Sequence, residues 1–229
     1  MSSPDAKPGT RSAAAPDARS DSAFPEDMLR RRVKAELRKR LRGLRKTMPE
    51  AACAERSRLI VDALAAQPSV ARARRVALFW PMVERHEVDL RPLDAALRAK
   101  GVHVAYPAIG EDGDMVFRDV ADPLRMVERG HMFAEPGDEE PLVGGDGRDL
   151  SSIDVMVVPA IAIDPAGHRI GYGAGYYDRA LARLAPGQVT IGVAYDFQLI
   201  SEVPVTDGDL PVSLVVTDHR VIDPSVPAP

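Results

Sequence analysis

Cysteine and long hydrophobic runs are nearly absent from this chain of 229 residues. Cys53 is the only cysteine, so no internal disulfide and no cysteine-based zinc cluster can form, and a reducing compartment is expected. No apolar run approaches the roughly 18 residues of a membrane span, and the first residues lack the apolar core of a secretory signal. These absences predict a cytoplasmic protein with no membrane partner.

The chain also lacks a strong net charge of either sign, since its formal value is −4. Overall charge therefore gives no argument for nucleic-acid binding. Basic residues are nevertheless concentrated in residues 30–46, which contain ten Lys or Arg and one acid, Glu36. Such a segment is most often a solvated helix face, and the alternatives are contacts with nucleotide phosphates or with an RNA backbone. No aromatic residue interleaves with these charges, which disfavours RNA.

Residues 1–25 are dominated by Ser, Ala, Pro, Asp and Arg and predict a disordered tail, because they offer little to bury. Residues 26–229 predict a single α/β catalytic domain. The pattern becomes helical at Glu26, and Pro49 ends this first helix. A second helix is predicted over residues 50–66 from its alanine-rich composition. The first helix should bury one apolar stripe formed by Leu29, Val33, Leu37, Leu41, Leu44 and Met48.

Strand and helix patterns alternate through the rest of the chain. A helix is predicted over residues 90–98 with its stop at Gly101, an edge strand over 115–120, and mostly loop over 121–150. The most apolar run, residues 153–160, predicts a central strand. Further strands are expected at residues 76–80, 102–106, 189–194 and 214–217. This alternation predicts a three-layer α/β fold with a largely parallel sheet, helices on both faces and ligands at the carboxyl ends of strands.

The most informative stretch is RIGYGAGYYDR, residues 169–179, at a predicted strand-to-helix junction. It lacks the last glycine of the dinucleotide fingerprint and the Gly-Lys-Ser/Thr of a P-loop. A loop rich in glycine can aim backbone amides at an anion, and the helix beginning near Tyr176 would add a partial positive charge. Arg169 and Arg179 flank it. The pattern thus indicates a phosphate site, although an ordinary structural turn explains the glycines equally well.

Three other stretches are informative together with this loop. They are KAELR at residues 34–38, WPM followed by EVD between residues 80 and 89, and IGVAYDFQ at residues 191–198. Together they resemble the 5-formyltetrahydrofolate cyclo-ligase family over residues 30–218. The resemblance implies a fold similar to the sugar-phosphate isomerase and CoA-transferase group. It also implies ATP- and Mg²⁺-dependent cyclisation of 5-formyltetrahydrofolate to 5,10-methenyltetrahydrofolate, giving ADP and phosphate after phosphorylation of the formyl oxygen.

The resemblance assigns roles to individual residues. Asp178 and Asp209 would bind Mg²⁺, and Trp80, Glu87 and Tyr176 would bind the folate. Arg169 and Tyr176 are the expected catalytic residues. ATP, as co-substrate, would be bound by Lys34, Arg38, Arg169, Gly171, Tyr172, Gly173, Ala174, Gly175, Tyr176 and Tyr177. The expected partners are these two substrates alone, with no nucleic acid, and the protein is expected to be a monomer or weak dimer.

The chain departs from the family pattern in three places. The turn between Met82 and Glu87 is slightly longer than usual, so Glu84 is an alternative to Glu87. Ala174 replaces a middle glycine, and His131 stands where an aromatic residue is usual. Little effect is expected from Ala174, but the longer turn and His131 support an alternative, a homologue that binds folate or nucleotide without turnover. An RNA-associated protein that uses the basic helix is a third possibility, and it predicts steeply salt-dependent binding.

Overall fold

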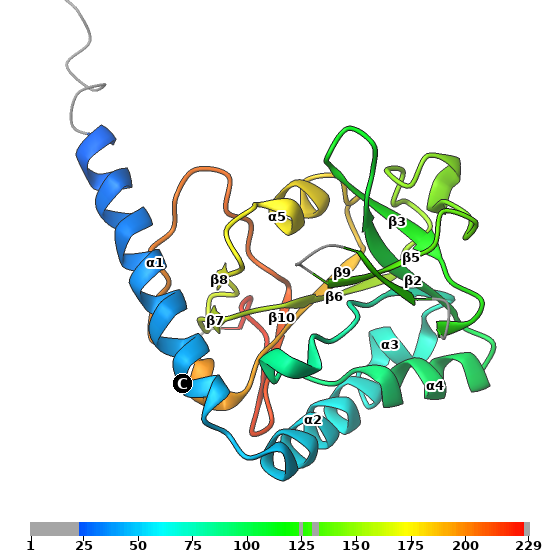
Figure 1. Ribbon diagram of the computed structural model, residues 1–229, viewed down its shortest axis with the longest axis horizontal. Coiled ribbons are helices and arrows are strands. Elements are labelled where there is room, and N and C mark those ends of the chain that lie inside the picture. Colours follow the sequence, from blue (N-terminus) through cyan, green and yellow to red (C-terminus); the bar gives the residue numbers. More distant parts are fainter. Residues whose placement is uncertain (1–22, 124–125, 130–132, 227–229) are drawn as a thin grey trace, which may run out of the picture.

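A seven-stranded sheet forms the centre of the molecule (Figure 1), in the order β11-β10-β9-β6-β1-β2-β3. The computed structural model describes residues 23–123, 126–129 and 133–226. β6 (Val155–Pro159) lies in the middle, as its apolar sequence predicted, because a central strand is covered on both faces. It pairs in parallel with β1 (Arg75–Ala77) and with β9 (Val189–Val193).

The parallel part of the sheet extends by one strand on each side, to β2 (His103–Ile109) and to β10 (Leu214–Val216). Both edge strands, β3 (Met115–Asp119) and β11 (Val221–Ile222), run antiparallel. The prediction of a largely parallel sheet is therefore confirmed, as is the edge position of β3. The sequence did not reveal β11, which is too short to show a pattern.

Helices cover both faces of the sheet and make the predicted three layers (Figure 1). On one face lie α2 (Glu50–Ala65), α3 (Pro68–Arg72) and α4 (Arg91–Ala99). Ile60 and Leu64 of α2 pack there in one apolar cluster with the sheet residue Val157. The other face is covered by α5 (Tyr176–Leu181), whose Leu181 belongs to a second cluster. No helix among the described residues is long and apolar enough to cross a membrane.

The region predicted to be mostly loop contains regular structure. A hairpin of β4 (Met126–Arg129) and β5 (Phe133–Pro136) crosses it, followed by the 3-10 turn η3 (Val143–Gly145). The Glu135 carboxylate accepts a hydrogen bond from the Ile109 amide at 3.0 Å, which ties the hairpin to β2. The prediction missed this hairpin because its strands are held by such tertiary contacts, while the flanking glycines, prolines and acids dominate the local pattern.

The first helix, α1 (Ala23–Lys46), stands at the side of the sheet (Figure 1). It begins three residues before the predicted start, and residues 1–22 of the predicted tail lie outside the described residues. The predicted single apolar stripe is wrong. Leu29, Val33 and Leu44 are exposed, while the buried residues of α1 are Lys34, Leu41 and Arg45.

The charged face of α1 turns inward because the helix packs on loops and small elements instead of the apolar sheet. Its neighbours are η1 (Val83–Arg85) and β7 (Ala162–Ile163), a short strand paired with β8 (Arg169–Ile170). Of the three buried α1 residues named above, only Leu41 belongs to an apolar cluster, in which it packs beside Ile161 and Val203. The η4 turn (Asp196–Gln198) completes the described elements. This arrangement brings the α1 cations next to the glycine-rich loop.

Candidate active site

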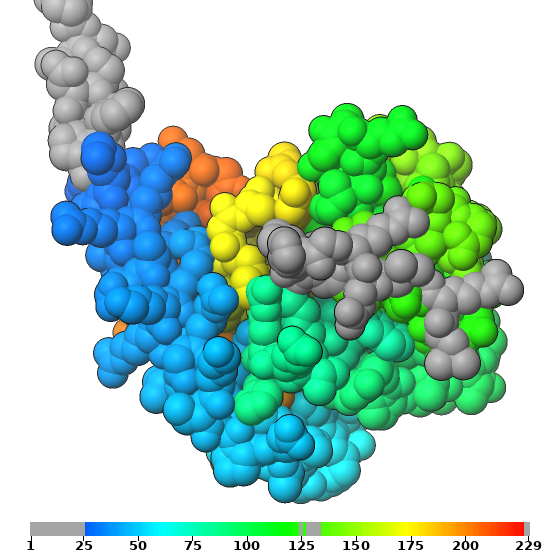
Figure 2. Space-filling model, in the orientation of Figure 1, coloured from blue at the N-terminus to red at the C-terminus, as the bar shows by residue number. Residues whose placement is uncertain are grey.

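A cavity of about 630 Å³ opens between α1, the glycine loop and the segments that follow β1 and β6. Phe79 and Trp80 line it just beyond the carboxyl end of β1, and Pro159 and Ile161 at the end of β6. This is where ligands bind in sheets of this kind, and the size suits a small-molecule site. Figure 2 shows the surface of α1 adjoining that of the glycine loop and α5 on the face in view.

The glycine loop follows β8 and leads directly into α5, as the sequence predicted. Gly173 has a φ of 108° and Gly175 a φ of 69°, values that residues with a Cβ atom rarely adopt. α5 has only six residues and ends before Leu184, so its dipole is smaller than the sequence suggested. Positive charge at this loop therefore depends mainly on side chains.

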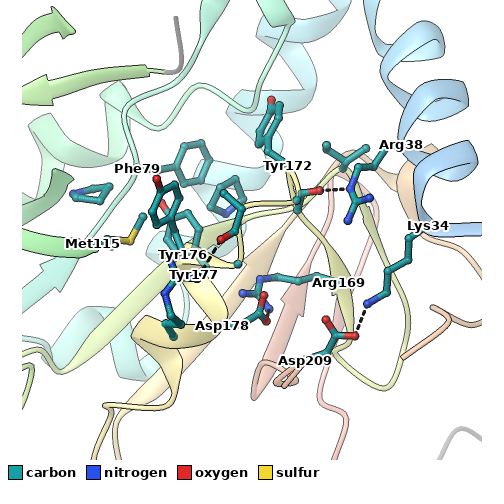
Figure 3. A pocket seen from close by; sticks show the side chains of 18 of the residues that line it. Lys34, Arg38, Phe79, Met115, Arg169, Tyr172, Tyr176, Tyr177, Asp178 and Asp209 are labelled. Carbon is teal, nitrogen blue, oxygen red and sulfur yellow. Dashed lines mark hydrogen bonds and ion pairs between the residues drawn. The ribbon is translucent and has the colours of Figure 1, made fainter. Parts of the chain in front are cut away.

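Two of these side chains come from α1, one helical turn apart. Lys34 is ion-paired with Asp209, and its Nζ also donates a hydrogen bond to Thr206 Oγ1 at 3.0 Å. Arg38 donates from Nε to the Gly171 carbonyl at 2.7 Å, and burial lowers its pKa despite the nearby Asp209 charge. In Figure 3 both point from α1 into the site. The basic residues of α1 thus lie next to the glycine loop, as expected.

The two predicted metal ligands lie on the same side of the cavity. Asp178 Oδ1 is 3.1 Å from Arg169 Nη1, and the Leu210 amide donates to Asp178 at 3.4 Å. Burial tends to raise the pKa of the neighbouring Asp209, but hydrogen bonds from Lys34 and Thr206 outweigh it and lower that pKa.

The described residues contain no group of three or more His, Cys, Asp or Glu side chains that could hold a metal ion. Two carboxylates nevertheless fit Mg²⁺, which commonly takes one or two of them and completes its shell with phosphate oxygens and water. Asp178 and Asp209 are thus suitable candidates only if a phosphate-bearing ligand binds with the ion.

The opposite wall is aromatic. Trp80 is half-buried, lines the cavity, and makes an edge-to-face contact with Tyr106 at 5.7 Å between ring centroids. It therefore packs against the core and faces the cavity at once. Tyr176 and Tyr177 also line the cavity, and the Arg179 guanidinium lies 5.1 Å from the centre of the Tyr176 ring. Glu87 belongs to this wall, whereas Glu84 is exposed and is not among the lining residues.

Tyr172 differs from the other predicted ATP ligands, because its side chain points away from Arg169 and Asp178 (Figure 3). Its hydroxyl donates a hydrogen bond to Glu87 Oε1 and accepts one from Arg45 Nη2 at 2.8 Å. Burial, together with the Glu87 charge, raises the pKa of Tyr172 to about 12, so the hydroxyl keeps its proton. Sequence reasoning missed Arg45. Its spacing from Lys34, Arg38 and Leu41, which places all four on one helix face, was the available signal.

The sequence model of the 5-formyltetrahydrofolate cyclo-ligase family matches residues 30–218. The chain belongs to this family. The resemblance seen in the sequence is thereby confirmed, as are the prediction of a ligase enzyme and its place in folate metabolism. The 5-formyltetrahydrofolate cyclo-ligase of Escherichia coli K12 is 32% identical over 157 residues, which are 67% of this chain and 83% of that protein.

Other cyclo-ligases agree in sequence and in fold. That of Mus musculus is 24% identical over 204 residues, covering 85% of this chain and 96% of that protein. The NMR structure of Aquifex aeolicus 5,10-methenyltetrahydrofolate synthetase has a TM-score of 0.73 at 29% identity, covering 86% of this chain and 95% of that one. The synthetase from Mycoplasma pneumoniae has a TM-score of 0.62 at 22% identity, covering 81% and 98%. Family membership accounts for the fold.

Proposed function

We propose that this cyclo-ligase family member converts 5-formyltetrahydrofolate to 5,10-methenyltetrahydrofolate, with ATP turned over to ADP and phosphate in a Mg²⁺-dependent reaction. The proposal rests on one observation above all. A single cavity is lined both by a cationic glycine loop suited to phosphates and by an aromatic wall that carries a carboxylate. These are the two kinds of surface that a nucleotide and a pterin require.

The phosphate end of ATP is assigned to the loop and to α1. Gly171, Gly173, Ala174 and Gly175 have no bulky side chain between their backbone and the cavity, and Lys34, Arg38 and Arg169 supply charge beside it. Asp178 and Asp209 would hold Mg²⁺, whose charge would offset that of the phosphates. Lys34 and Arg169 are paired with these carboxylates, so we expect the cations to exchange carboxylate partners for phosphate oxygens when ATP binds.

The folate ring is assigned to the aromatic wall. A pterin is flat and presents hydrogen-bond donors and acceptors along one edge, so it suits stacking on an aromatic surface next to an acceptor carboxylate. Trp80 and Tyr176 provide the surface, and Glu87 provides the carboxylate. Because Glu84 is exposed outside the cavity lining, we assign this role to Glu87.

The chemistry begins when the formyl oxygen attacks the γ-phosphorus of ATP and the bond from that phosphorus to the β-phosphate oxygen breaks, releasing ADP. N10 of the folate then attacks the activated formyl carbon. The C–O bond breaks, N10 loses its proton, and phosphate leaves with the former formyl oxygen. We assign to Arg169, whose side chain is 3% exposed and lines the cavity, the stabilisation of charge on the transferred phosphoryl group. We assign to Tyr176 the orientation of the reacting folate.

The alternative is a homologue that binds folate or nucleotide without turnover. The longer turn before Glu87 favoured it in the sequence, but that turn is folded as η1 and leaves Glu87 in the cavity wall. His131, the other departure, lies outside the described residues.

The deciding test is the rise of methenyl-folate absorbance with 5-formyltetrahydrofolate, ATP and Mg²⁺, measured together with ADP release. We expect one ADP for each methenyl-folate. Folate binding by calorimetry with no product at high protein concentration would support the non-catalytic alternative. Steeply salt-dependent binding in an RNA gel shift would instead support the RNA-associated alternative.

A further inference from the structure

One buried polar network near the cavity is not explained by the proposed roles. It consists of Arg45 on α1, Tyr172 in the glycine loop and Glu87 after η1, which we call the carboxylate clamp. The Arg45 side chain is 5% exposed and that of Glu87 3%. An apolar set of similar volume would pack here at lower desolvation cost, so a buried charged network calls for a reason beyond stability.

The clamp fixes the Glu87 carboxylate at both oxygens. Oε2 accepts the Met82 amide at 2.9 Å, and Oε1 accepts the Tyr172 hydroxyl. Arg45 Nη2 lies 3.8 Å from Oε1 and donates to the Tyr172 oxygen at 2.8 Å. Together these contacts hold the carboxylate in one orientation, and the Arg45 charge lies close to it. A carboxylate held in this way presents a fixed acceptor toward the cavity.

Arg45 is itself held at a second point. Its backbone carbonyl is 3.1 Å from Nδ1 of His86, the residue that precedes Glu87. His86 has a φ of 51°, in the left-handed region that residues other than glycine rarely occupy. Strained residues of this kind persist where the surrounding structure fixes them and are concentrated at functional sites. The turn before Glu87 is therefore tied to α1 through both the backbone and the side chain of Arg45.

We propose that Arg45 and the Tyr172 hydroxyl are positioning residues, which act through Glu87 to set the affinity for the folate ring. This inference rests on the proposed function, because it takes Glu87 to be the folate-binding carboxylate. It also reassigns the Tyr172 side chain. The backbone of Tyr172 belongs to the phosphate loop, while its hydroxyl serves the folate wall, so one residue connects the two subsites.

The most direct test is Tyr172→Phe, which removes the hydroxyl and keeps the ring that lies near the Arg42 and Arg85 guanidinium groups. Calorimetry with 5-formyltetrahydrofolate alone should show affinity weakened by about tenfold, in line with loss of one charge-assisted hydrogen bond. The KM for folate should rise by a similar factor, and the KM for ATP should stay within about twofold of wild type. Arg45→Met should weaken folate binding at least as much, and Arg45→Lys should restore part of it.

Two further variants separate positioning from packing. Arg42→Met is the matched control, since Arg42 is an exposed α1 arginine that also lies over the Tyr172 ring, at 5.7 Å, and its loss should leave the folate KM unchanged. The double variant Tyr172→Phe with Glu87→Gln should bind folate no more weakly than Glu87→Gln alone, because Tyr172 acts through Glu87.

The outcomes are distinguishable. If Tyr172→Phe lowers the melting temperature but leaves folate affinity within twofold of wild type, the clamp is only structural and the inference is wrong. Equal rises in both KM values would show loss of loop order instead, and would also overturn it. Wild-type protein that binds no folate would overturn the proposed function and this inference together. If Arg45→Met fails to fold, Tyr172→Phe still decides between these outcomes.

Discussion

Lys34 of α1 is ion-paired with Asp209, so a residue proposed to bind phosphate neutralises one proposed to bind a metal ion (Figure 3). We expect each ligand to compete with this pair when it binds its proposed residue. ATP alone would leave Asp209 without its cation, close to the phosphate charge. Mg²⁺ alone would compete with Lys34 for the same carboxylate. Binding both together gives each side chain a new partner, which favours coupled binding.

We therefore expect Mg²⁺ to tighten ATP binding by about tenfold, a common size for coupling between two ligands. Isothermal titration of ATP into the protein with Mg²⁺ and with excess EDTA measures this directly. Asp209→Asn should bind metal-free ATP more tightly than wild type, because Lys34 is then available to phosphate, and should lose most of the Mg²⁺ effect. Equal ATP affinities for wild type with and without Mg²⁺ would contradict the exchange of partners.

Asp178→Asn should reduce kcat by at least about 100-fold, the usual scale for losing a group that stabilises transition-state charge. The fold should survive, because the Asp178 side chain is 28% exposed and Arg169 keeps its hydrogen bond to the Leu210 carbonyl. Circular dichroism checks the fold, and absorbance of methenyl-folate measures turnover. Asp207→Asn is a suitable comparison, since Asp207 also lines the cavity but has no proposed role. If Asp178→Asn turned over at the wild-type rate, the assignment of Asp178 as a Mg²⁺ ligand would be wrong.

Glu87→Gln and Glu84→Gln form a matched pair that tests which acid binds folate. The first change removes the charge from a carboxylate in the cavity wall, and the second acts on an exposed side chain. We expect the folate KM to rise at least about tenfold for Glu87→Gln, by loss of a hydrogen bond to a charged group, and to stay unchanged for Glu84→Gln. Steady-state kinetics at saturating ATP gives both values, and the reverse order would show that Glu84 is the ligand.

Two glycine-to-alanine changes should have opposite effects on stability. Gly173→Ala places a Cβ at a φ of 108°, so the folded state should be destabilised by about 1–2 kcal/mol even though the nearest atom, Arg38 Cζ, is 3.7 Å away. Gly43→Ala lies inside α1 with nothing within 4 Å and should stabilise the protein by about 0.5–1 kcal/mol. Urea unfolding measures both. A neutral result for Gly173→Ala would mean that the loop tolerates a different backbone conformation.

The stability contributed by Tyr172 should depend on alkaline pH. Its pKa is raised to about 12 in the folded protein, by burial and then by the Glu87 charge, whereas an unfolded tyrosine titrates near 10. The contribution is therefore complete below about pH 10 and is lost as pH rises toward 12. The difference in unfolding free energy between wild type and Tyr172→Phe, followed from pH 8 to 12, should shrink over that interval. A constant difference would show that the hydroxyl does not titrate in this way.

The family, the central position of β6 and the junction of the glycine loop with α5 could all be predicted before the fold was known. These are local features, because an apolar run, closely spaced glycines and helical spacing of apolar residues can each be recognised within a few residues of sequence. The sequence also placed Lys34 and Arg38 together, since residues four apart share a helix face. The resemblance assigned folate binding to Trp80, Glu87 and Tyr176; all three line the cavity, and their folate contacts stay a prediction.

Which face of α1 is buried, and what that face contacts, became visible only in the folded molecule. Periodicity marked the leucines and valines of α1 as its buried stripe, yet Leu29, Val33 and Leu44 are exposed while Lys34 and Arg45 are buried. The reason is that α1 packs beside the glycine loop, η1 and the turn at residues 206–209. There the carboxylates of Asp209 and Glu87 offset the buried charges. A pattern of hydrophobicity reports the tendency of side chains to leave water. Whether a buried cation meets a carboxylate depends on segments far apart in the chain, which only folding brings together.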